Sequence, residues 1–139
     1  MDDRPWLRGS TRSILVLMAS TLAYVAAGAI ALWGAAHVLP TRRVVSGFEP
    51  LSTDNRRVLV QEWLAEAFIM WGIAAVVVVG TVTHSGSGVD WLYRTMAALL
   101  AALAGLTALT GARTAVVVFK ICVGLLLGSA ALLLAASFL

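Results

Sequence analysis

The chain has 139 residues, of which 60% are hydrophobic and only 12% are charged, and its mean hydropathy is +0.93. A soluble domain usually carries about a quarter charged residues, so this composition excludes an ordinary water-soluble domain. The formal net charge is +3, but the arginines flank apolar segments and form no continuous basic face. We therefore expect no nucleic-acid partner, and the expected counter-charge is a lipid bilayer with anionic head groups.

Four apolar segments are long enough to cross a hydrocarbon core of about 30 Å, which takes roughly 20 residues of helix. The expected helices, with an interfacial loop at 40–53 and a link at 84–90, cover about 13–39, 54–83, 91–110 and 114–139. Membrane β-strands are excluded because the apolar runs do not alternate. The sequence therefore predicts an all-α polytopic membrane protein, a four-transmembrane-helix antiparallel bundle in which residues 1–139 form one membrane domain.

Small residues predict which helix faces pack together. In the first segment alanine recurs every four residues, at 19, 23, 27, 31 and 35, and such a stripe permits close helix approach in lipid. In the third segment, we expect a central helix that packs along Ala97, Ala101, Gly105 and Ala108. Gly124 and Gly128 form a Gly-xxx-Gly pattern, which is typical of close contact either within the bundle or in a homodimer.

Aromatic residues near the segment ends are typical of anchors at the membrane surface. We interpret Trp33 in this way at the end of the first helix, and Trp91, Tyr93 and Arg94 at the start of the third. Cys122 cannot form an intrachain disulfide because it is the single cysteine, and we interpret it as a small packing residue.

The loop at 40–53 is too apolar for a solvated linker. It carries Val44, Val45 and Phe48 beside Arg42 and Arg43, so we expect it to rest on the membrane surface with its arginines on phosphates. A lid folded over the bundle is the alternative. One residue among 52–54 should then cap the second helix.

The charge bias between the two membrane faces is almost balanced. Four arginines, at positions 4, 8, 12 and 94, oppose five at positions 42, 43, 56, 57 and 113. Because three arginines precede the first helix, which often dominates orientation, we expect both termini to be cytoplasmic in a bacterial-type plasma membrane.

Ionisable residues gather in one half of the predicted bundle. Counting residues from the helix ends at about 1.5 Å each places Glu66 and Lys120 at a similar depth, and His37 ends the first helix on the same side. Glu62 and Glu66 are four residues apart and share a helix face with Leu59, Ile69 and Ile73. Charges within a span usually face the interior and find partners.

The candidate residues of a substrate or proton site are Glu62, Glu66, Lys120, His37, Trp63, Arg57 and Arg113. We expect Glu66 to pair with Lys120, and Glu62 with Arg57, Arg113 or His37. A purely structural role is the alternative, in which the two acids lie at an interfacial helix start and Lys120 extends its ammonium to the surface.

No motif in the sequence indicates a cofactor or a metal. One cysteine and two histidines without ligand spacing do not make a zinc site, and the Glu-x-x-His pairs of di-iron bundles are missing. No nucleophilic triad, phosphate-binding glycine loop or dinucleotide motif is present, so an enzyme is not the favoured interpretation.

Three functions remain open. The first is a binding or accessory subunit with a polar pocket near one membrane face. The second is a proton-coupled transporter of a cationic or amphipathic compound, working as a homodimer. The four short helices resemble those of small multidrug-resistance transporters in architecture, but that family's glutamate lies in the first helix, where 13–39 has none. The third is a membrane-embedded enzyme that acts on a lipid-soluble substrate with Glu62 or Glu66 as general base.

Overall fold

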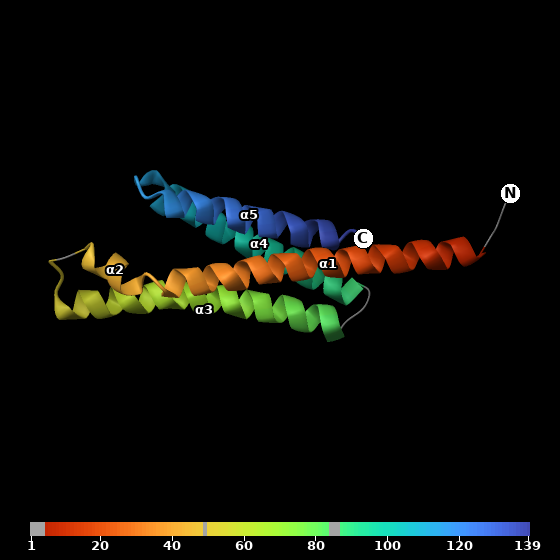
Figure 1. Cartoon of the computed structure of the whole chain (residues 1–139), viewed down its shortest axis with the longest axis horizontal. Helices are drawn as coiled ribbons and strands as arrows, with labels where there is room; N and C mark the ends of the chain where they lie inside the picture. Colours follow the sequence, from red (N-terminus) through yellow and green to blue (C-terminus); the bar gives the residue numbers. More distant parts are fainter. Residues whose placement is uncertain (1–4, 49, 84–86) are drawn as a thin grey trace.

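The computed structural model describes residues 5–48, 50–83 and 87–139. The four long helices are α1 (Pro5–Val38), α3 (Thr53–Thr83), α4 (Ser87–Leu109) and α5 (Val117–Ala136). Two short helices lie in the connections, namely α2 (Thr41–Ser46) and the 3-10 turn η1 (Gly111–Arg113). Each long helix contains a segment that is long and apolar enough to cross a membrane. The predicted all-α bundle of four antiparallel helices is confirmed (Figure 1).

The central helix of the bundle is α1, which packs against both α3 and α5. The fourth long helix, α4, packs mainly against α5 and forms a hairpin with it through η1. The prediction that residues 91–110 form the central helix is therefore wrong. Helix α4 is not central because it packs closely only against α5 and contacts α3 over a short length.

Helices α3 and α4 meet at one end and separate toward the other (Figure 1). At the closed end, the Tyr93 hydroxyl and Thr81 Oγ1 are 2.8 Å apart. Thr81 donates its own proton to the Val77 carbonyl, so Tyr93 is the donor in this pair. Gly80 lies against Leu92 at the same level, where a Cβ would come within 2.7 Å of the leucine side chain. At the η1 end the two helices enclose an open pocket.

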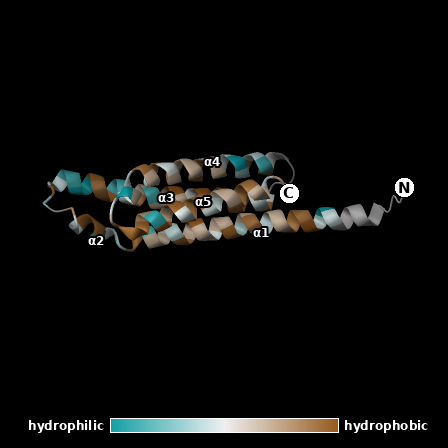
Figure 2. Ribbon diagram, turned by 90° about the horizontal axis from the view of Figure 1, so that it is seen from above, coloured by the Kyte–Doolittle hydropathy of each residue, from teal (hydrophilic) through white to brown (hydrophobic). Residues whose placement is uncertain are grey.

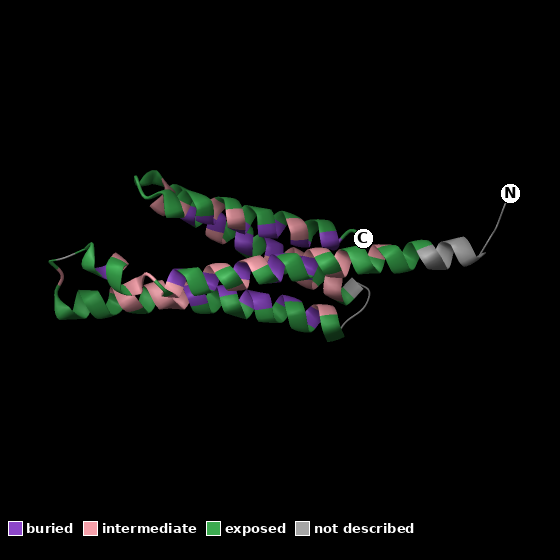
Figure 3. Cartoon of the chain, in the orientation of Figure 1, coloured by how far each residue is buried: buried purple, intermediate pink, exposed green. Residues whose placement is uncertain are grey.

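The core lies where the four helices face one another, and the outer surfaces are exposed (Figure 3). Its residues recur every three or four positions, as helical periodicity requires. The largest fully buried side chains in the four helices are Ile30, Met70, Val77, Leu100, Leu126 and Leu133. Within the predicted alanine stripe of α1, Ala23 and Ala27 are buried, while Ala35 is exposed.

Two other small-residue faces point outward. The inward face of α4 carries Ala97, Leu100 and Ala104, whereas Ala101, Gly105 and Ala108 of the predicted face are exposed. Gly124 and Gly128 of α5 are also exposed, and nothing lies within 4 Å of a Cβ built on either. The intramolecular interpretation of the Gly-xxx-Gly pattern is therefore wrong, and contact in a dimer stays a prediction.

Two aromatic residues predicted as surface anchors point inward instead. The Trp33 indole donates a hydrogen bond to the Cys122 sulfur at 3.1 Å, between α1 and α5. Tyr93 is buried against Thr81. Trp91 is exposed, as an anchor should be, and the Arg94 guanidinium lies over its ring at 5.3 Å.

The connections are more ordered than the sequence predicted. The loop at 40–53 contains α2, whose Val45 is buried against α3, so this part of the loop folds on the outer end of α3. Ser52 provides the expected cap, since its hydroxyl accepts a hydrogen bond from the Asn55 N–H at 3.1 Å. Helix α4 already begins at Ser87 within the predicted link 84–90, of which 84–86 lie outside the described residues.

Candidate functional site

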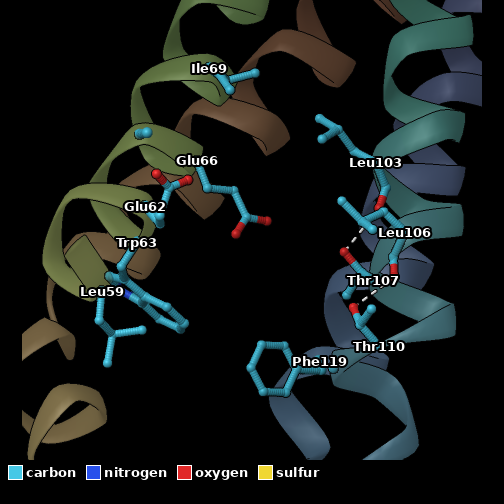
Figure 4. Close-up of a pocket in the computed structure, with 12 residues that line it drawn as sticks. Leu59, Glu62, Trp63, Glu66, Ile69, Leu103, Leu106, Thr107, Thr110 and Phe119 are labelled. Carbon is cyan, nitrogen blue, oxygen red and sulfur yellow. Dashed lines mark hydrogen bonds between the residues drawn. The ribbon is translucent and has the colours of Figure 1, made fainter. Parts of the chain in front are cut away.

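A pocket of about 360 Å³ lies between α3 and the α4–α5 hairpin, at the end where α3 and α4 separate (Figure 4). It is open to the outside between the helices. Its lining residues come from α3, α4, η1 and α5, and they are Leu59, Glu62, Trp63, Ala65, Glu66, Ile69, Leu103, Leu106, Thr107, Thr110, Gly111 and Phe119.

Glu66 is the half-buried acid of this pocket, with 32% of its side chain exposed. Its Oε2 atom lies 3.2 Å from Nε2 of His37, which is only 7% exposed. The two atoms are close enough for an ion pair but are not aligned for a hydrogen bond, and Nε2 has no hydrogen-bond partner among the described residues. A buried polar nitrogen without a hydrogen bond is unfavourable by about 1–3 kcal/mol. Since His37 is not among the lining residues, a ligand in the pocket would meet Glu66 and not this nitrogen.

Trp63 fixes the position of His37. The two rings stack with centroids 4.1 Å apart and an interplanar angle of 16°. The Trp63 indole N–H also donates to the His37 carbonyl at 2.8 Å, which satisfies one of the unpaired carbonyl groups at the end of α1. On the pocket side, the Phe119 ring meets Trp63 edge to face at a centroid distance of 6.4 Å. The imidazole is thereby held beside Glu66.

Most polar atoms of the pocket wall are hydrogen-bond acceptors. Glu62 and Glu66 contribute carboxylates from α3. The hydroxyls of Thr107 and Thr110 donate to carbonyls of their own helix, at 2.9 Å and 2.7 Å, so their oxygen atoms remain as acceptors (Figure 4). The indole N–H of Trp63 is already used. No lysine or arginine is among the lining residues, so the pocket favours a ligand that donates hydrogen bonds or carries positive charge.

Four of the predicted site residues come together, namely Glu62, Glu66, Trp63 and His37. Lys120 does not join them, because its side chain is exposed on α5 and is not part of the pocket lining. The basic side chain next to Glu66 is therefore His37, and the predicted pairing of Glu66 with Lys120 is wrong.

The two predicted arginines also lie outside the pocket lining. Arg57 is exposed and pairs with Asp54 one turn away, at 3.6 Å, rather than with Glu62. Arg113 is exposed in η1. Glu62 itself is exposed at the pocket rim.

Nine of the twelve lining residues were not among the predicted candidates, and the polar or aromatic ones of these nine are Thr107, Thr110 and Phe119. The two threonines are three residues apart and therefore share a helix face, which is a signal that the sequence does contain. Phe119 gives no comparable signal, since it is one aromatic residue in an apolar segment. Among the described residues, no three His, Cys, Asp or Glu side chains are grouped as they would be to hold a metal ion.

Comparison with known proteins finds no matching family model, no matching curated protein and no matching solved structure. The fold and the pocket nevertheless define a class. The chain is a bundle of four helices that can span a membrane, with an acidic pocket between α3 and the α4–α5 hairpin at one end.

Proposed function

We propose that this protein is a membrane binding protein, which holds an amphiphile with a cationic head group in the pocket between α3 and the α4–α5 hairpin. The observation that carries the proposal is the Glu66 carboxylate, which is half-buried at the wall of an open pocket lined by acceptors and by no lysine or arginine. His37 faces one oxygen of this carboxylate but is not part of the pocket lining, so the pocket side of Glu66 is open to a further, charged partner. An ammonium group supplies both the charge and the hydrogen-bond donors.

The shape and composition of the pocket support an amphiphile rather than a free ion. Leu59, Ile69, Leu103 and Leu106 line the pocket around the acids, so an apolar body has a complementary surface. The rings of Trp63 and Phe119 lie at the same pocket, and aromatic faces attract cations by about 0.5–2 kcal/mol. Because the pocket is open between α3 and α4, a ligand dissolved in the lipid can enter sideways.

The test is equilibrium binding of monodansylcadaverine, a fluorescent compound with a primary ammonium, to the protein in phosphatidylcholine nanodiscs. Glu66→Gln should weaken binding about tenfold, because a hydrogen bond to a charged group contributes about 1.5 kcal/mol or more. N-acetylated dansylcadaverine, which has the same body without the charge, should bind the wild-type protein about tenfold more weakly than the ammonium compound does.

Two variants provide matched controls. Asp54→Asn removes a carboxylate from the same helix outside the pocket, and Lys120→Gln removes the cation that is exposed on α5. Both should bind the probe as the wild type does. Equal weakening by Asp54→Asn and Glu66→Gln, or equal affinity for the acetylated compound, would contradict the proposal.

A binding protein of this size can serve as an accessory subunit of a larger complex in the cell membrane. This role predicts a stoichiometric partner that co-purifies in mild detergent. The orientation proposed from the first helix places both termini in the cytoplasm, and reporter fusions at each terminus test it. Activity of a cytoplasmic reporter at only one terminus would contradict this topology.

A proton-coupled transporter is the second candidate, and the shape of the α3–α4 interface favours it over an enzyme. The interface is open near η1 and closed by Tyr93 and Thr81 at the other end. A substrate could therefore reach the pocket from one end of the bundle only in this conformation. Glu66, which lies next to His37, is the carboxylate that would bind either a proton or the cationic substrate in turn. Proteoliposomes that contain the wild-type protein should then accumulate the ammonium probe in response to a pH gradient, and Glu66→Gln should abolish this uptake. If the protein only binds the ligand, the wild type should show no uptake either.

A further inference from the structure

Helices α3 and α4 run antiparallel, so the contacts at their closed end determine which residues face each other across the pocket. At that end the Thr81 and Tyr93 hydroxyls are 2.8 Å apart, and Gly80 lies against Leu92. Because both helices rise about 1.5 Å per residue, residues that lie equally far along the two helices from this closed-end contact are at equal depth. The depth of each lining residue can therefore be counted from Gly80 on α3 and from Leu92 on α4.

Two levels of the pocket each combine a carboxylate with a hydroxyl. Counted from the closed-end contact, Glu66 lies 14 residues along α3 and Thr107 lies 15 residues along α4. Glu62 and Thr110 each lie 18 residues from the same contact. Figure 4 shows both acids on the α3 wall and both threonines on the α4 wall opposite. Each of these two polar levels therefore presents acceptors from two helices.

The next level of the pocket is apolar. Ile69 and Leu103 each lie 11 residues from the closed-end contact, and both line the pocket. In the other direction α3 continues to its start at Thr53, which is hydrophilic (Figure 2). A ligand that lies along the pocket therefore has its polar part toward the membrane surface and its apolar part toward the middle of the bundle.

The polar part of the ligand needs N–H donors rather than a quaternary ammonium group. The hydroxyls of Thr107 and Thr110 donate their protons to their own helix, so they can only accept. A quaternary ammonium group is recognised mainly by aromatic faces. His37 covers one face of the Trp63 ring at a centroid distance of 4.1 Å, so that face is not open to a ligand.

The distance between the two polar levels matches a short diamine. Glu62 and Glu66 are four residues apart, which is about 6 Å along the helix, and the two threonines are three residues apart, which is about 4.5 Å. One ammonium group cannot contact both levels at once. Two nitrogens joined by three methylene groups are about 5 Å apart, because four bonds of about 1.5 Å join them at tetrahedral angles.

We propose that the ligand of this pocket is an N-alkyl diamine, with its inner nitrogen at the level of Glu66 and its outer nitrogen at the level of Glu62. The Thr107 and Thr110 hydroxyls accept further N–H groups from the opposite wall. The alkyl chain follows the apolar level. This inference rests on the proposed function and specifies the substrate class of the same site.

The experiment measures displacement of monodansylcadaverine from the protein in phosphatidylcholine nanodiscs. The competitors are N-decyl-1,3-diaminopropane and decylamine, and their amounts are expressed as mole fractions in the lipid so that unequal partitioning does not count. The wild type should bind the diamine about fivefold more tightly, because the second ion pair lies at the exposed rim and contributes modestly. N-decyl-N′-acetyl-1,3-diaminopropane, which keeps the length but loses the outer charge, should bind as decylamine does.

Three variants assign this preference to residues. Glu62→Gln should abolish the preference for the diamine and leave the affinity for decylamine within about twofold of the wild type. Thr110→Val should reduce the preference by about half, because a neutral acceptor contributes less than a carboxylate. Asp54→Asn is the matched control, since it removes a carboxylate from the start of the same helix outside the pocket, and it should keep the full preference.

Two results would overturn the proposal. The first is equal affinity of the wild type for the diamine and for decylamine. The second is an equal loss of preference in Glu62→Gln and Asp54→Asn, which would show diffuse attraction to an acidic surface. Unchanged binding of monodansylcadaverine to Glu62→Gln would show that the pocket of this variant is intact.

The same data separate this inference from the proposed function. If monodansylcadaverine does not bind the wild type, or binds Glu66→Gln equally well, the proposed function fails and the diamine site fails with it. If binding of the probe depends on Glu66 but the diamine has no advantage over decylamine, only the second ammonium group is refuted.

Discussion

Trp63 binds His37 twice, once by stacking on its imidazole ring at a centroid distance of 4.1 Å and once by donating its indole N–H to the His37 carbonyl. Both contacts connect α3 to the last turn of α1. Since His37 lies 3.2 Å from Glu66, the tryptophan also determines where the partner of the pocket carboxylate stands. One side chain thus connects helix packing with the candidate site.

Replacement of Trp63 by phenylalanine should separate these two contacts. Phenylalanine can still stack on the imidazole but has no N–H to donate, so Trp63→Phe should lower the free energy of unfolding by about 1 kcal/mol. Trp91→Phe is the matched control, because Trp91 is 65% exposed on the outer surface. Unfolding by sodium dodecyl sulfate in mixed micelles measures both variants, and an equal effect of the two would show that the Trp63 hydrogen bond contributes nothing.

The sequence predicted the fold because the length of an apolar run depends only on the thickness of the membrane. It did not predict which faces of α4 pack. In water the outer face of a helix is polar, whereas in lipid Ala101 and Gly105 on the outside are as acceptable as Ala97 and Ala104 on the inside. The composition of a face therefore carries little information on its direction.

The candidate site shows the same limit. Spacing placed Glu62 and Glu66 on one face, and the structure has both at the pocket. Counting residues along the helices placed Lys120 at the same depth in the membrane as Glu66. This count does not tell toward which side of α5 the Lys120 side chain points. Adjacent residues of a helix point about 100° apart, so Lys120 turns away because Phe119 faces the pocket. That rotation depends on how α5 packs against α1 and α4, which one sequence does not state.

Gly34 is required for the close approach of α1 and α3. A Cβ at this position would lie 2.8 Å from Nε1 of Trp71 and 3.3 Å from the Ala67 carbonyl oxygen. The Trp71 indole donates to the Ala31 carbonyl at 3.0 Å, so it cannot move without losing that bond. Gly34→Ala should therefore destabilise the protein by about 1–3 kcal/mol.

Gly28 provides the comparison within the same helix. Nothing lies within 4 Å of a Cβ at Gly28, so Gly28→Ala gains helix propensity and should stabilise by up to about 1 kcal/mol. Thermal unfolding followed by circular dichroism should give opposite signs for the two glycine-to-alanine changes. A Gly34→Ala protein as stable as Gly28→Ala would mean that α1 and α3 are not in close contact there.

Arg94 joins the start of α4 to the end of α5. Its guanidinium donates to the Ser137 hydroxyl at 3.2 Å and to the Ser137 carbonyl at 3.0 Å, and it lies 4.9 Å from the centre of the Phe138 ring. A lysine keeps the charge but not the planar, two-bond geometry. Arg94→Lys should lower the free energy of unfolding by about 1–2 kcal/mol. Arg113→Lys, at an exposed position in η1, should leave it within about 0.5 kcal/mol in the same unfolding assay.

The hydrogen bond from Tyr93 to Thr81 closes the end of the α3–α4 interface that lies opposite the pocket. Tyr93→Phe and Thr81→Val should each destabilise by about 1 kcal/mol. Thr81→Val also removes the hydroxyl that donates to Val77, so the bond is measured by the double-mutant cycle and not by either single variant. A coupling energy of about 0.5–1 kcal/mol is expected in sodium dodecyl sulfate unfolding.

If the protein is a transporter, loosening this contact should also change the rate of ammonium uptake without changing probe affinity, because neither residue lines the pocket. Additive single effects would show that the two hydroxyls do not interact and that other contacts, such as that of Gly80 with Leu92, close this end.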